Sequence, residues 1–366
     1  MEQKEPQSSM SKDINILYNE AVELLKELIT TPSFSKEEGD TAALIGKFFA
    51  LKGIAASRVG NNIFALNEHF DESKPTILLN SHHDTVKPNK GYTLNPFEAI
   101  EKEAKLFGLG SNDAGGSLVA LIATFLHFYP LQNLNYNLAL AATAEEEISG
   151  TGGIEMILPF LPKINCAIVG EPTQMQMAVA ERGLMVLDCV AHGKAGHAAR
   201  NEGENALYKA IKDIEWFQNY PFEKNSELLG ACKFNVTSIE TENKQHNVVP
   251  AQCRFIVDVR VNELYSFDEL LQIIKANVQS DVTPRSTRLK STNIALNHPL
   301  VQAGTTLGRT YYGSPTTSDK ALMPFPALKI GPGDSARSHT ADEFIYTNEI
   351  KEGIELYIQL LNQLLL

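Results

Sequence analysis

The sequence predicts an α/β protein built from two domains. Its short apolar runs are continuous rather than alternating, and they lie at 76–79, 138–142 and 167–169. Helix-length segments, 114–128 and about 152–160, separate these runs. Continuous apolar strands with intervening helices are typical of a sheet that is covered on both faces. The chain length of 366 residues suits roughly two domains, because a domain takes about 150 residues.

Helical spacing and end signals predict the elements on either side of these strands. Apolar residues repeat at helical spacing over 14–29, and the run stops before Pro32. Ser35 and Glu38 form a capping-box pattern that predicts the start of a second helix, which ends at Gly53. Nearer the C-terminus the pattern predicts a helix near 299–308, a strand at 327–330 and a helix from about 347.

A change of pattern near residue 176 predicts a smaller second domain. Its elements follow the order β-α-β-β-α-β, which is the ferredoxin-like arrangement. The predicted elements are 183–191, 203–217, 232–239, 253–261, 267–278 and 286–292. We therefore expect a disordered leader at 1–12, a discontinuous catalytic domain at 13–176 and 292–366, and an inserted domain at 177–291.

The composition excludes several classes of protein. With 44 acidic and 32 basic residues the formal charge is −12, which argues against binding to nucleic acid or to an anionic membrane. We find no apolar run near the roughly 20 residues that span a bilayer, and no apolar core of a secretory signal at the N-terminus. Four scattered cysteines predict reduced thiols in a cytoplasmic protein.

Histidines and carboxylates gather in five separate segments, most of them directly after predicted strands. In an open α/β sheet, ligands bind outside the carboxyl ends of the strands, so these segments are expected to face one crevice. The segments are SHHDTV at 81–86, GLGSNDAGG at 108–116, AEEE at 144–147, GEPT at 170–173 and GPGDSARSHT at 331–340.

A ligand set of two imidazoles and three carboxylates suits zinc or cobalt better than magnesium. One aspartate reaching two ions would hold them about 3.5–4 Å apart, which is the usual two-metal geometry. A single His-x-Asp is a weak signal, and three glutamates are often only a solvated surface. Here, however, the glutamates directly follow an apolar strand. The 108–116 loop lacks the third glycine of a dinucleotide loop, and no Gly-x-Ser-x-Gly is present. These residues favour a two-metal hydrolase.

Taken together and in order, the motifs SHHDTV, GLGSNDAGG, TAEEE, VGEPT and GPGDSARSHT closely resemble the M20 metallopeptidase family. That family includes acetylornithine deacetylase, succinyl-diaminopimelate desuccinylase, aminoacylase and carboxypeptidase G. The resemblance covers about 14–366. It implies a mixed-sheet zinc-hydrolase domain with an inserted ferredoxin-like lid that also forms a homodimer.

The resemblance implies a role for each residue of the five motifs. His82 and Glu171 would bind one Zn²⁺, Glu147 and His339 the other, and Asp113 would bridge them; Co²⁺ is an expected substitute. Asp84 would accept the free imidazole N–H of His82, and Glu146 would be the general base. Two alternatives stay open: His83 as a rival ligand, and a shift by one position within Glu145–Glu147, because the family usually has Asp-Glu-Glu there.

Further resemblances fall in the lid and near the C-terminus. His197 matches a histidine that stabilises the oxyanion in a dimer-related site; the alternative is an ordinary surface histidine. Asn247 and Arg260 match lid positions, with Arg260 suited to a substrate carboxylate or else paired with Asp258 or Glu263. A substrate loop of the catalytic domain is expected at Thr317 and Ser318.

The overall resemblance favours an acetylornithine deacetylase-like enzyme, which acts on a small N-acyl amino acid. The substrate would be N-acetyl- or N-succinyl-ornithine or -citrulline, in arginine biosynthesis. Succinyl-diaminopimelate desuccinylase is the second interpretation and a di- or tripeptidase the third. A non-catalytic binding module is the alternative from a different class.

Overall fold

The computed structural model describes residues 6–200 and 202–366, which form two compact units. The main unit comprises the chain up to Val179 together with Ile294–Tyr312 and Ser318–Leu366. The inserted unit comprises Ala180–Asn293 and Gly313–Thr317. The sequence interpretation placed the two boundaries of the insertion at 177 and 291, and it did not separate 313–317 from the main unit.

The main unit is built on a mixed sheet whose central strands are parallel. Strand β3 lies between β6 and β7, and β7 also pairs in parallel with β17. All seven residues of both β3 and β6 are buried, as expected for continuous apolar strands. The order within this unit is β1 (Ala56–Val59), β2 (Asn62–Leu66), β6 (Asn137–Thr143), β3 (Thr76–His82), β7 (Cys166–Val169), β17 (Ala327–Lys329) and β8 (Met177–Glu181).

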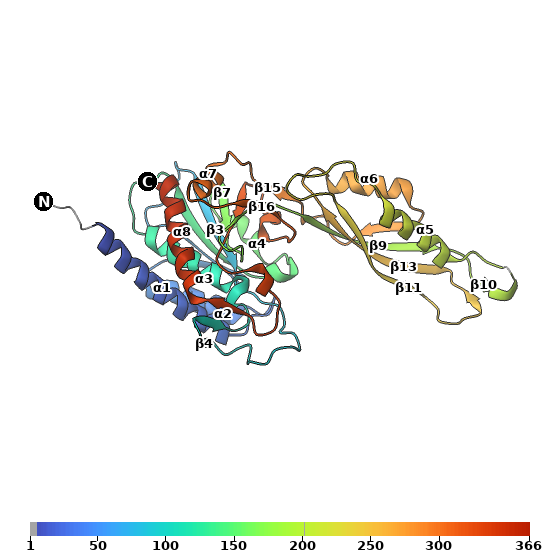
Figure 1. Ribbon diagram of the computed structural model, residues 1–366, viewed down its shortest axis with the longest axis horizontal. Coiled ribbons are helices and arrows are strands. Elements are labelled where there is room, and N and C mark those ends of the chain that lie inside the picture. Colours follow the sequence, from blue (N-terminus) through green and yellow to red (C-terminus); the bar gives the residue numbers. More distant parts are fainter. Residues whose placement is uncertain (1–5, 201) are drawn as a thin grey trace. The chain divides into compact units, whose positions relative to one another are not determined.

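Helices and short helical turns cover this sheet. Helix α3 contacts α1 and α8 as well as β3 and β6, so these helices form a layer on one face (Figure 1). On the other face, Ile154 and Ile157 of α4 pack with Leu78 and Val169 of the sheet. The helices are α1 (Pro6–Thr30), α2 (Gly39–Leu51), α3 (Gly116–Phe128), α4 (Ile154–Ile157), α7 (Pro299–Thr306) and α8 (Thr347–Leu365). The short turns are η1 (Ser111–Gly115), η2 (Glu146–Ile148), η3 (Leu158–Phe160), η5 (Asp319–Leu322) and η6 (Ser335–Arg337).

Short strands complete the main unit. Strand β18 pairs with β5, and β5 with β4, in a small antiparallel sheet. Strand β16 pairs with β8. Their bounds are β4 (Ile100–Lys102), β5 (Lys105–Phe107), β16 (Tyr311–Ser314) and β18 (Phe344–Tyr346).

The first two helices begin at other residues than the sequence predicts. The expected leader lies partly outside the described residues, since 1–5 are not described, while α1 begins at Pro6 rather than near residue 14. The predicted start of the second helix at Ser35 is wrong, because α2 begins at Gly39 with Glu38 as its N-cap. Gly53 follows this helix with a φ of 73°, in agreement with a glycine stop.

The inserted unit has the ferredoxin-like β-α-β-β-α-β order. Its antiparallel sheet has the order β11-β13-β9-β14, and residues of α5 and α6 form one apolar core with β9 and β13. The last strand of the insertion was predicted at 286–292. In the structure this strand is β14, which spans Asp281–Pro284 and pairs with β9 at the edge of the sheet. The elements are β9 (Gly183–His192), β10 (Gly196–His197), η4 (Ala198–Arg200), α5 (Ala206–Asn219), β11 (Lys233–Thr241), β12 (Val248–Val249), β13 (Gln252–Val261), α6 (Phe267–Asn277), β14 (Asp281–Pro284) and β15 (Thr292–Asn293).

The four cysteines are free and buried, as the sequence interpretation expected for reduced thiols. Burial raises the pKa of Cys166 and of Cys189 to about 12, so these thiols stay protonated at neutral pH. Among the described helices, none is long and apolar enough to cross a membrane.

Candidate metal centre

Five residues from separate segments of the main unit form two ligand groups that share Asp113. The first group is His82, Asp113 and Glu171, and the second is Asp113, Glu147 and His339. Within each group, one ligand atom from each residue lies within 4.8 Å of the others. His82 ends β3, and the two glutamates follow the neighbouring parallel strands β6 and β7, so the ends of these strands bring the groups together.

Asp113 lies between the two imidazoles. Its Oδ1 is 3.4 Å from Nε2 of His82, and its Oδ2 is 3.6 Å from Nε2 of His339. Nε2 of His82 is also 3.9 Å from Oε1 of Glu171, and Nε2 of His339 is 3.0 Å from Oε2 of Glu147. Each carboxylate oxygen of Asp113 therefore faces a different ligand group, which is the arrangement that a bridging ligand needs.

The imidazole of His82 supports the fit of this cluster to a metal ion. Its Nε2 is buried and has no hydrogen-bond partner among the described residues. Its Nδ1 lies 3.0 Å from the carbonyl oxygen of Asp84, so in the neutral ring Nδ1 carries the proton and the lone pair of Nε2 is available for a metal ion. A buried polar atom without a hydrogen-bond partner lowers the stability of the folded protein. Two imidazoles with three carboxylates are a suitable donor set for zinc or a similar ion.

The pKa shifts show that the cluster carries excess negative charge. The hydrogen bond to Glu147, together with nearby carboxylates, raises the pKa of His339 to about 9. Burial alone would lower the pKa of His82, but the charge of Glu146 and the contact with Asp113 raise it well above its usual value. Burial raises the pKa of Glu146 well above the usual range. Bound cations would relieve this excess negative charge.

Asp84 makes contacts that differ from the expected ones. The imidazole of His82 binds the main-chain carbonyl of Asp84, whereas the nearest carboxylate oxygen is 3.4 Å away. The carboxylate instead accepts hydrogen bonds from the hydroxyl of Ser35 at 2.7 Å and from the main-chain N–H groups of Glu146 at 3.0 Å and Glu147 at 3.2 Å. Asp84 thus holds the turn that carries the two glutamates, while its carbonyl orients His82.

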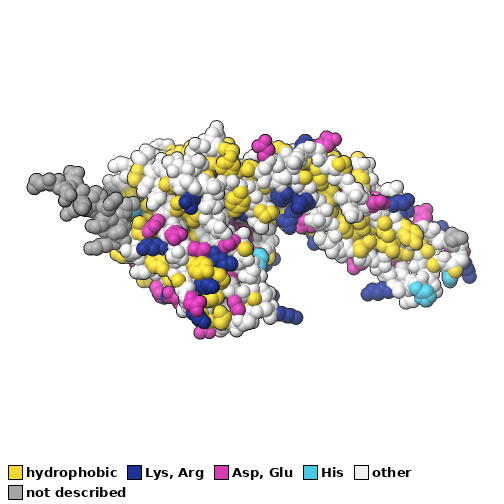
Figure 2. Space-filling view, viewed as in Figure 1, with side chains coloured by type: hydrophobic (Ala, Val, Ile, Leu, Met, Phe, Trp, Pro, Cys, Tyr) yellow, Lys and Arg dark blue, Asp and Glu magenta, His cyan; other side chains and the backbone are white. Residues whose placement is uncertain are grey.

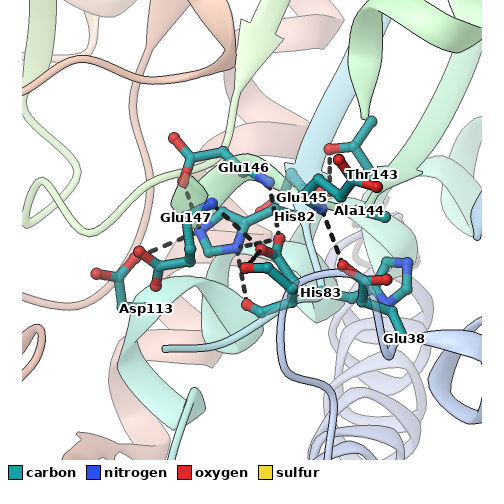
Figure 3. A network of polar contacts seen from close by, with 12 residues as sticks. Glu38, His82, His83, Asp113, Thr143, Ala144, Glu145, Glu146 and Glu147 are labelled. Carbon is teal, nitrogen blue, oxygen red and sulfur yellow. Dashed lines mark hydrogen bonds and ion pairs between the residues drawn. The ribbon is translucent and has the colours of Figure 1, made fainter. Parts of the chain in front are cut away.

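Within the three consecutive glutamates, only the second and third face the ligand groups (Figure 3). Glu145 has a φ of 55°, and its carboxylate accepts the N–H of Gly152 at 3.2 Å. A Cβ on Gly152 would lie 2.2 Å from that carboxylate, which explains the glycine. Oε2 of Glu146 lies 3.9 Å from Nε2 of His82.

Glu38 is a supporting residue that the sequence interpretation did not identify. Its side chain is buried, and it accepts the N–H of Lys36 at 2.6 Å, the side-chain amide of Asn61 at 2.9 Å and the N–H of Glu145 at 3.2 Å. Glu38 and Asp84 together therefore hold the N–H groups of 145, 146 and 147 (Figure 3). The only sequence signal was Ser-x-x-Glu, which is the same pattern as a capping box.

His83 belongs to neither ligand group. It is buried, its Nδ1 lies 2.9 Å from the hydroxyl of Thr41, and its Nε2 lies 2.9 Å from the carbonyl oxygen of Asn61. Both ring nitrogens are therefore engaged inside the fold. Burial lowers the pKa of His83, which favours the neutral form.

Three of the residues expected to contact substrate, His197, Asn247 and Arg260, lie in the inserted unit. His197 is exposed on β10, and the N–H of the next residue donates to the carbonyl of Asn247 at 3.0 Å, so the two positions are adjacent. Arg260 makes two hydrogen bonds to the carboxylate of Asp258, at 2.8 and 3.1 Å. This is one of the alternative pairings that the sequence analysis considered.

Thr317 and Ser318 were expected in one loop of the catalytic domain, but the boundary between the units falls between them. The hydroxyl of Thr317 donates to the carbonyl of Arg182 at 2.9 Å. Ser318 is buried and is the N-cap of η5. Both side chains therefore take part in holding the local backbone.

The family model described as peptidase family M20/M25/M40 matches residues 78–363. The chain belongs to this family. Among its curated relatives is succinyl-diaminopimelate desuccinylase of Wolbachia pipientis wMel, 24% identical over 94% of this chain and 95% of the relative. Further curated relatives carry the same name, with 24–27% identity in Ruegeria, Paracoccus and Rickettsia.

Solved structures of the M20 family share the fold. Aminopeptidase PepT from Bacillus cereus matches with a TM-score of 0.77 and 18% identity, over 95% of this chain and 98% of that chain. The YXEP protein of Bacillus subtilis, described as a dinuclear metal-binding peptidase, matches with a TM-score of 0.70 and 14% identity, over 95% and 98%. The protein is thus an M20-family metallohydrolase with a mixed α/β fold.

The buried Glu38 generates a test of the supporting contacts. Glu38→Gln is expected to lower the free energy of unfolding by about 1–3 kcal/mol, because it removes a buried charge that accepts three N–H donors. The measurement is urea unfolding of the metal-free protein. The matched control, Glu37→Gln, changes an exposed neighbour and should stay within about 0.5 kcal/mol of the wild type. Equal stability of the two variants would contradict the assigned role of Glu38.

Proposed function

We propose that this M20 protein is a two-metal amidohydrolase that removes the acyl group from a small N-acyl amino acid. The observation that carries the proposal is the pair of ligand groups that share Asp113, with Glu146 beside them. Succinyl-diaminopimelate desuccinylase is the name of the curated relatives, so we place N-succinyl-diaminopimelate first among the substrates. This reverses the order expected from overall resemblance, which placed N-acyl-ornithine and N-acyl-citrulline first.

The proposed cofactor is a pair of Zn²⁺ ions, for which Co²⁺ would substitute. His82 and Glu171 would hold one ion and Glu147 and His339 the other, with Asp113 shared. Such a pair, when bound, lowers the pKa of water towards about 7 and polarises the amide carbonyl.

Glu146 would act as the general base. A carboxylate that binds a metal has its lone pairs committed, whereas Glu146 lies outside both ligand groups. It would take a proton from the attacking water and deliver it to the amine leaving group, a contribution of about 10²–10⁴-fold. Asp84 would hold the carboxylate of Glu146 in place through the main-chain N–H that it accepts.

The inserted unit would supply oxyanion and substrate contacts. In a homodimer, His197 of one copy would donate a hydrogen bond to the substrate carbonyl oxygen in the site of the other copy, as negative charge develops on that oxygen. Arg260 would exchange Asp258 for a substrate carboxylate, since a guanidinium binds either in the same bidentate way. Asn247, Thr317 and Ser318 would complete the substrate contacts through side-chain or main-chain groups.

The inserted unit is also the proposed surface of a homodimer. Strand β11 lies at the edge of its sheet, so one side of its backbone is free to pair. Ile239 on β11 is 47% exposed, and Tyr208 on α5 is 65% exposed. Hydrophobic side chains gather on the inserted unit in the face shown in Figure 2. We propose a cytoplasmic enzyme whose partners are its small substrate and a second copy, with no nucleic acid or membrane partner.

Two alternative functions are less well supported. A di- or tripeptidase agrees with the descriptions of solved structures, but these are at most 18% identical and show the fold alone. A non-catalytic module would be expected to lose ligands, whereas this chain keeps both ligand groups and Glu146.

A substrate panel tests the proposal directly. The panel contains the N-acetyl and N-succinyl forms of ornithine, citrulline, lysine and diaminopimelate, with dipeptides as a comparison. We expect the highest kcat/KM for N-succinyl-diaminopimelate, loss of turnover with a chelator, and recovery with Zn²⁺ or Co²⁺. A metal-loaded protein that hydrolyses dipeptides and none of the acyl compounds would replace this proposal with the peptidase.

Glu146→Gln separates the general base from the metal ligands. Turnover is expected to fall by about 10²–10⁴-fold, because the amide cannot accept the proton. The metal content, measured by elemental analysis, should equal that of the wild type. The exposed Glu72→Gln serves as the control and should change neither quantity. Loss of an ion in Glu146→Gln would instead assign this residue to a ligand group.

His197→Ala tests the role of the inserted unit. We expect kcat to fall by about 10²–10³-fold, as for removal of one oxyanion donor, with unchanged metal content and unchanged mass in solution. His192→Ala, a change at another exposed histidine of the same unit, is the matched control and should keep its kcat. If both variants retain full turnover, His197 has no part in the reaction.

A further inference from the structure

A buried carboxylate outside both ligand groups holds the loop that carries Asp113. Glu343, immediately before β18, has a relative exposure of 2%. Its Oε1 accepts the main-chain N–H groups of Asn112 and Asp113, each at 2.9 Å, and its Oε2 accepts the N–H of Gly110 at 3.2 Å. Glu343 and Asp113 are 230 positions apart in the chain, so the contact exists only in the folded protein.

The loop depends on such a partner because its backbone is irregular. Asp113 has φ −119° and ψ 97°, which is not helical, and Gly110 has a φ of 76°. The three N–H groups that Glu343 accepts are therefore outside a regular helical ladder. Without the side chain of Glu343, these N–H groups would lose their hydrogen-bond acceptor, which would destabilise this conformation of the loop. Glu343 thus fixes the backbone from which the carboxylate of Asp113 reaches both ligand groups.

The same contact extends to the loop that carries His339. The side-chain amide of Asn112 donates to the carbonyl of Asp334 at 3.0 Å and accepts the N–H of Asp334 at 3.0 Å. Glu343 binds the main chain of Asn112, and the side chain of Asn112 binds the 331–340 loop at Asp334. Glu343 therefore also supports the position of that loop. One carboxylate is therefore connected to a ligand of each proposed ion.

The carboxyl group of Glu343 is committed to the main chain. Among the described residues, no lysine or arginine forms an ion pair with it, and its hydrogen-bond donors are neutral N–H groups. Burial and the nearby charge of Asp113 raise the pKa of Glu343 to about 8.

We propose that Glu343 is a positioning residue that sets the affinity of the centre for its divalent ions by holding the loop that carries Asp113. The inference rests on the proposed two-metal function. It goes beyond that function, since Glu343 is neither a ligand nor a group that touches substrate.

The neighbouring Asp342 provides a matched control. Its carboxylate also accepts main-chain N–H groups, from Thr93 at 2.8 Å and Leu94 at 2.9 Å, together with the hydroxyl of Thr93 at 2.6 Å. These contacts hold a different loop, which contributes no residue to the ligand groups. Asp342→Asn therefore removes a carboxyl group with similar main-chain contacts at the adjacent position, without changing the support of Asp113.

The test compares the metal affinities of Glu343→Gln, Glu343→Asp and Asp342→Asn. Zn²⁺ is added to metal-free protein in competition with a chromophoric chelator, and Co²⁺ binding is followed by visible absorption. Glu343→Gln is expected to bind at least one ion about 10–100-fold more weakly, the usual loss when a residue that supports metal ligands is changed. Glu343→Asp, which keeps a carboxyl group but is one methylene shorter, should lose less, and Asp342→Asn should bind as the wild type.

The outcomes separate this inference from the proposed function. Wild-type affinity in Glu343→Gln, or a lower melting temperature of the metal-free protein without weaker metal binding, would reduce Glu343 to a structural residue. If Glu343→Gln does not fold, Glu343→Asp decides, and wild-type affinity in that variant overturns the proposal. Failure of the wild type itself to bind two ions would instead refute the two-metal function.

Discussion

Acidic side chains are concentrated where three parallel strands end. The structure of this region depends on the hydrogen bonds between carboxyl groups and main-chain N–H groups that fix the positions of these side chains. His82 ends β3, Glu147 and Glu171 follow β6 and β7, and Asp113 joins them from a separate loop. Carboxylates at such distances repel one another, so they require either cations or a rigid frame. The ligand groups supply a site for cations, and hydrogen bonds from the main chain supply the frame.

Three carboxylates outside the ligand groups provide most of this frame. Glu38 and Asp84 accept the N–H groups of the turn at 145–147, and Glu343 accepts those of the loop at 110–113. In each case the acceptor is a side-chain carboxyl group, and the donors belong to the segment that carries a ligand or the proposed base. Such hydrogen bonds fix the direction as well as the distance of the groups that they join. Two of these three side chains, Glu38 and Glu343, come from segments outside the five motifs.

Close packing of the loops adds to the frame. A Cβ on Gly331 would lie 2.4 Å from the hydroxyl of Ser117 and 2.5 Å from the carbonyl of Glu171. Glycine at this position lets the loop that carries His339 approach the segment that carries Glu171. Residues of the inserted unit, by contrast, hold their side chains in local contacts, as Arg260 does with Asp258. The proposed contact of Arg260 with a substrate carboxylate would require an exchange of partners.

The sequence by itself determined the alternation of strands and helices, the ferredoxin-like insertion and the five segments that meet at the site. Those features are recorded in local spacing, because buried strands are continuously apolar and ligands follow them directly. Only the tertiary structure decided that the side chains of Ser35 and Glu38 support the acidic turn rather than form a capping box, that the last strand of the insertion is Asp281–Pro284, and that Glu343 supports Asp113. The sequence shows which hydrogen-bonding groups a residue carries. The partners of these groups depend on the tertiary structure, because the folded chain determines which buried N–H groups lack a main-chain acceptor.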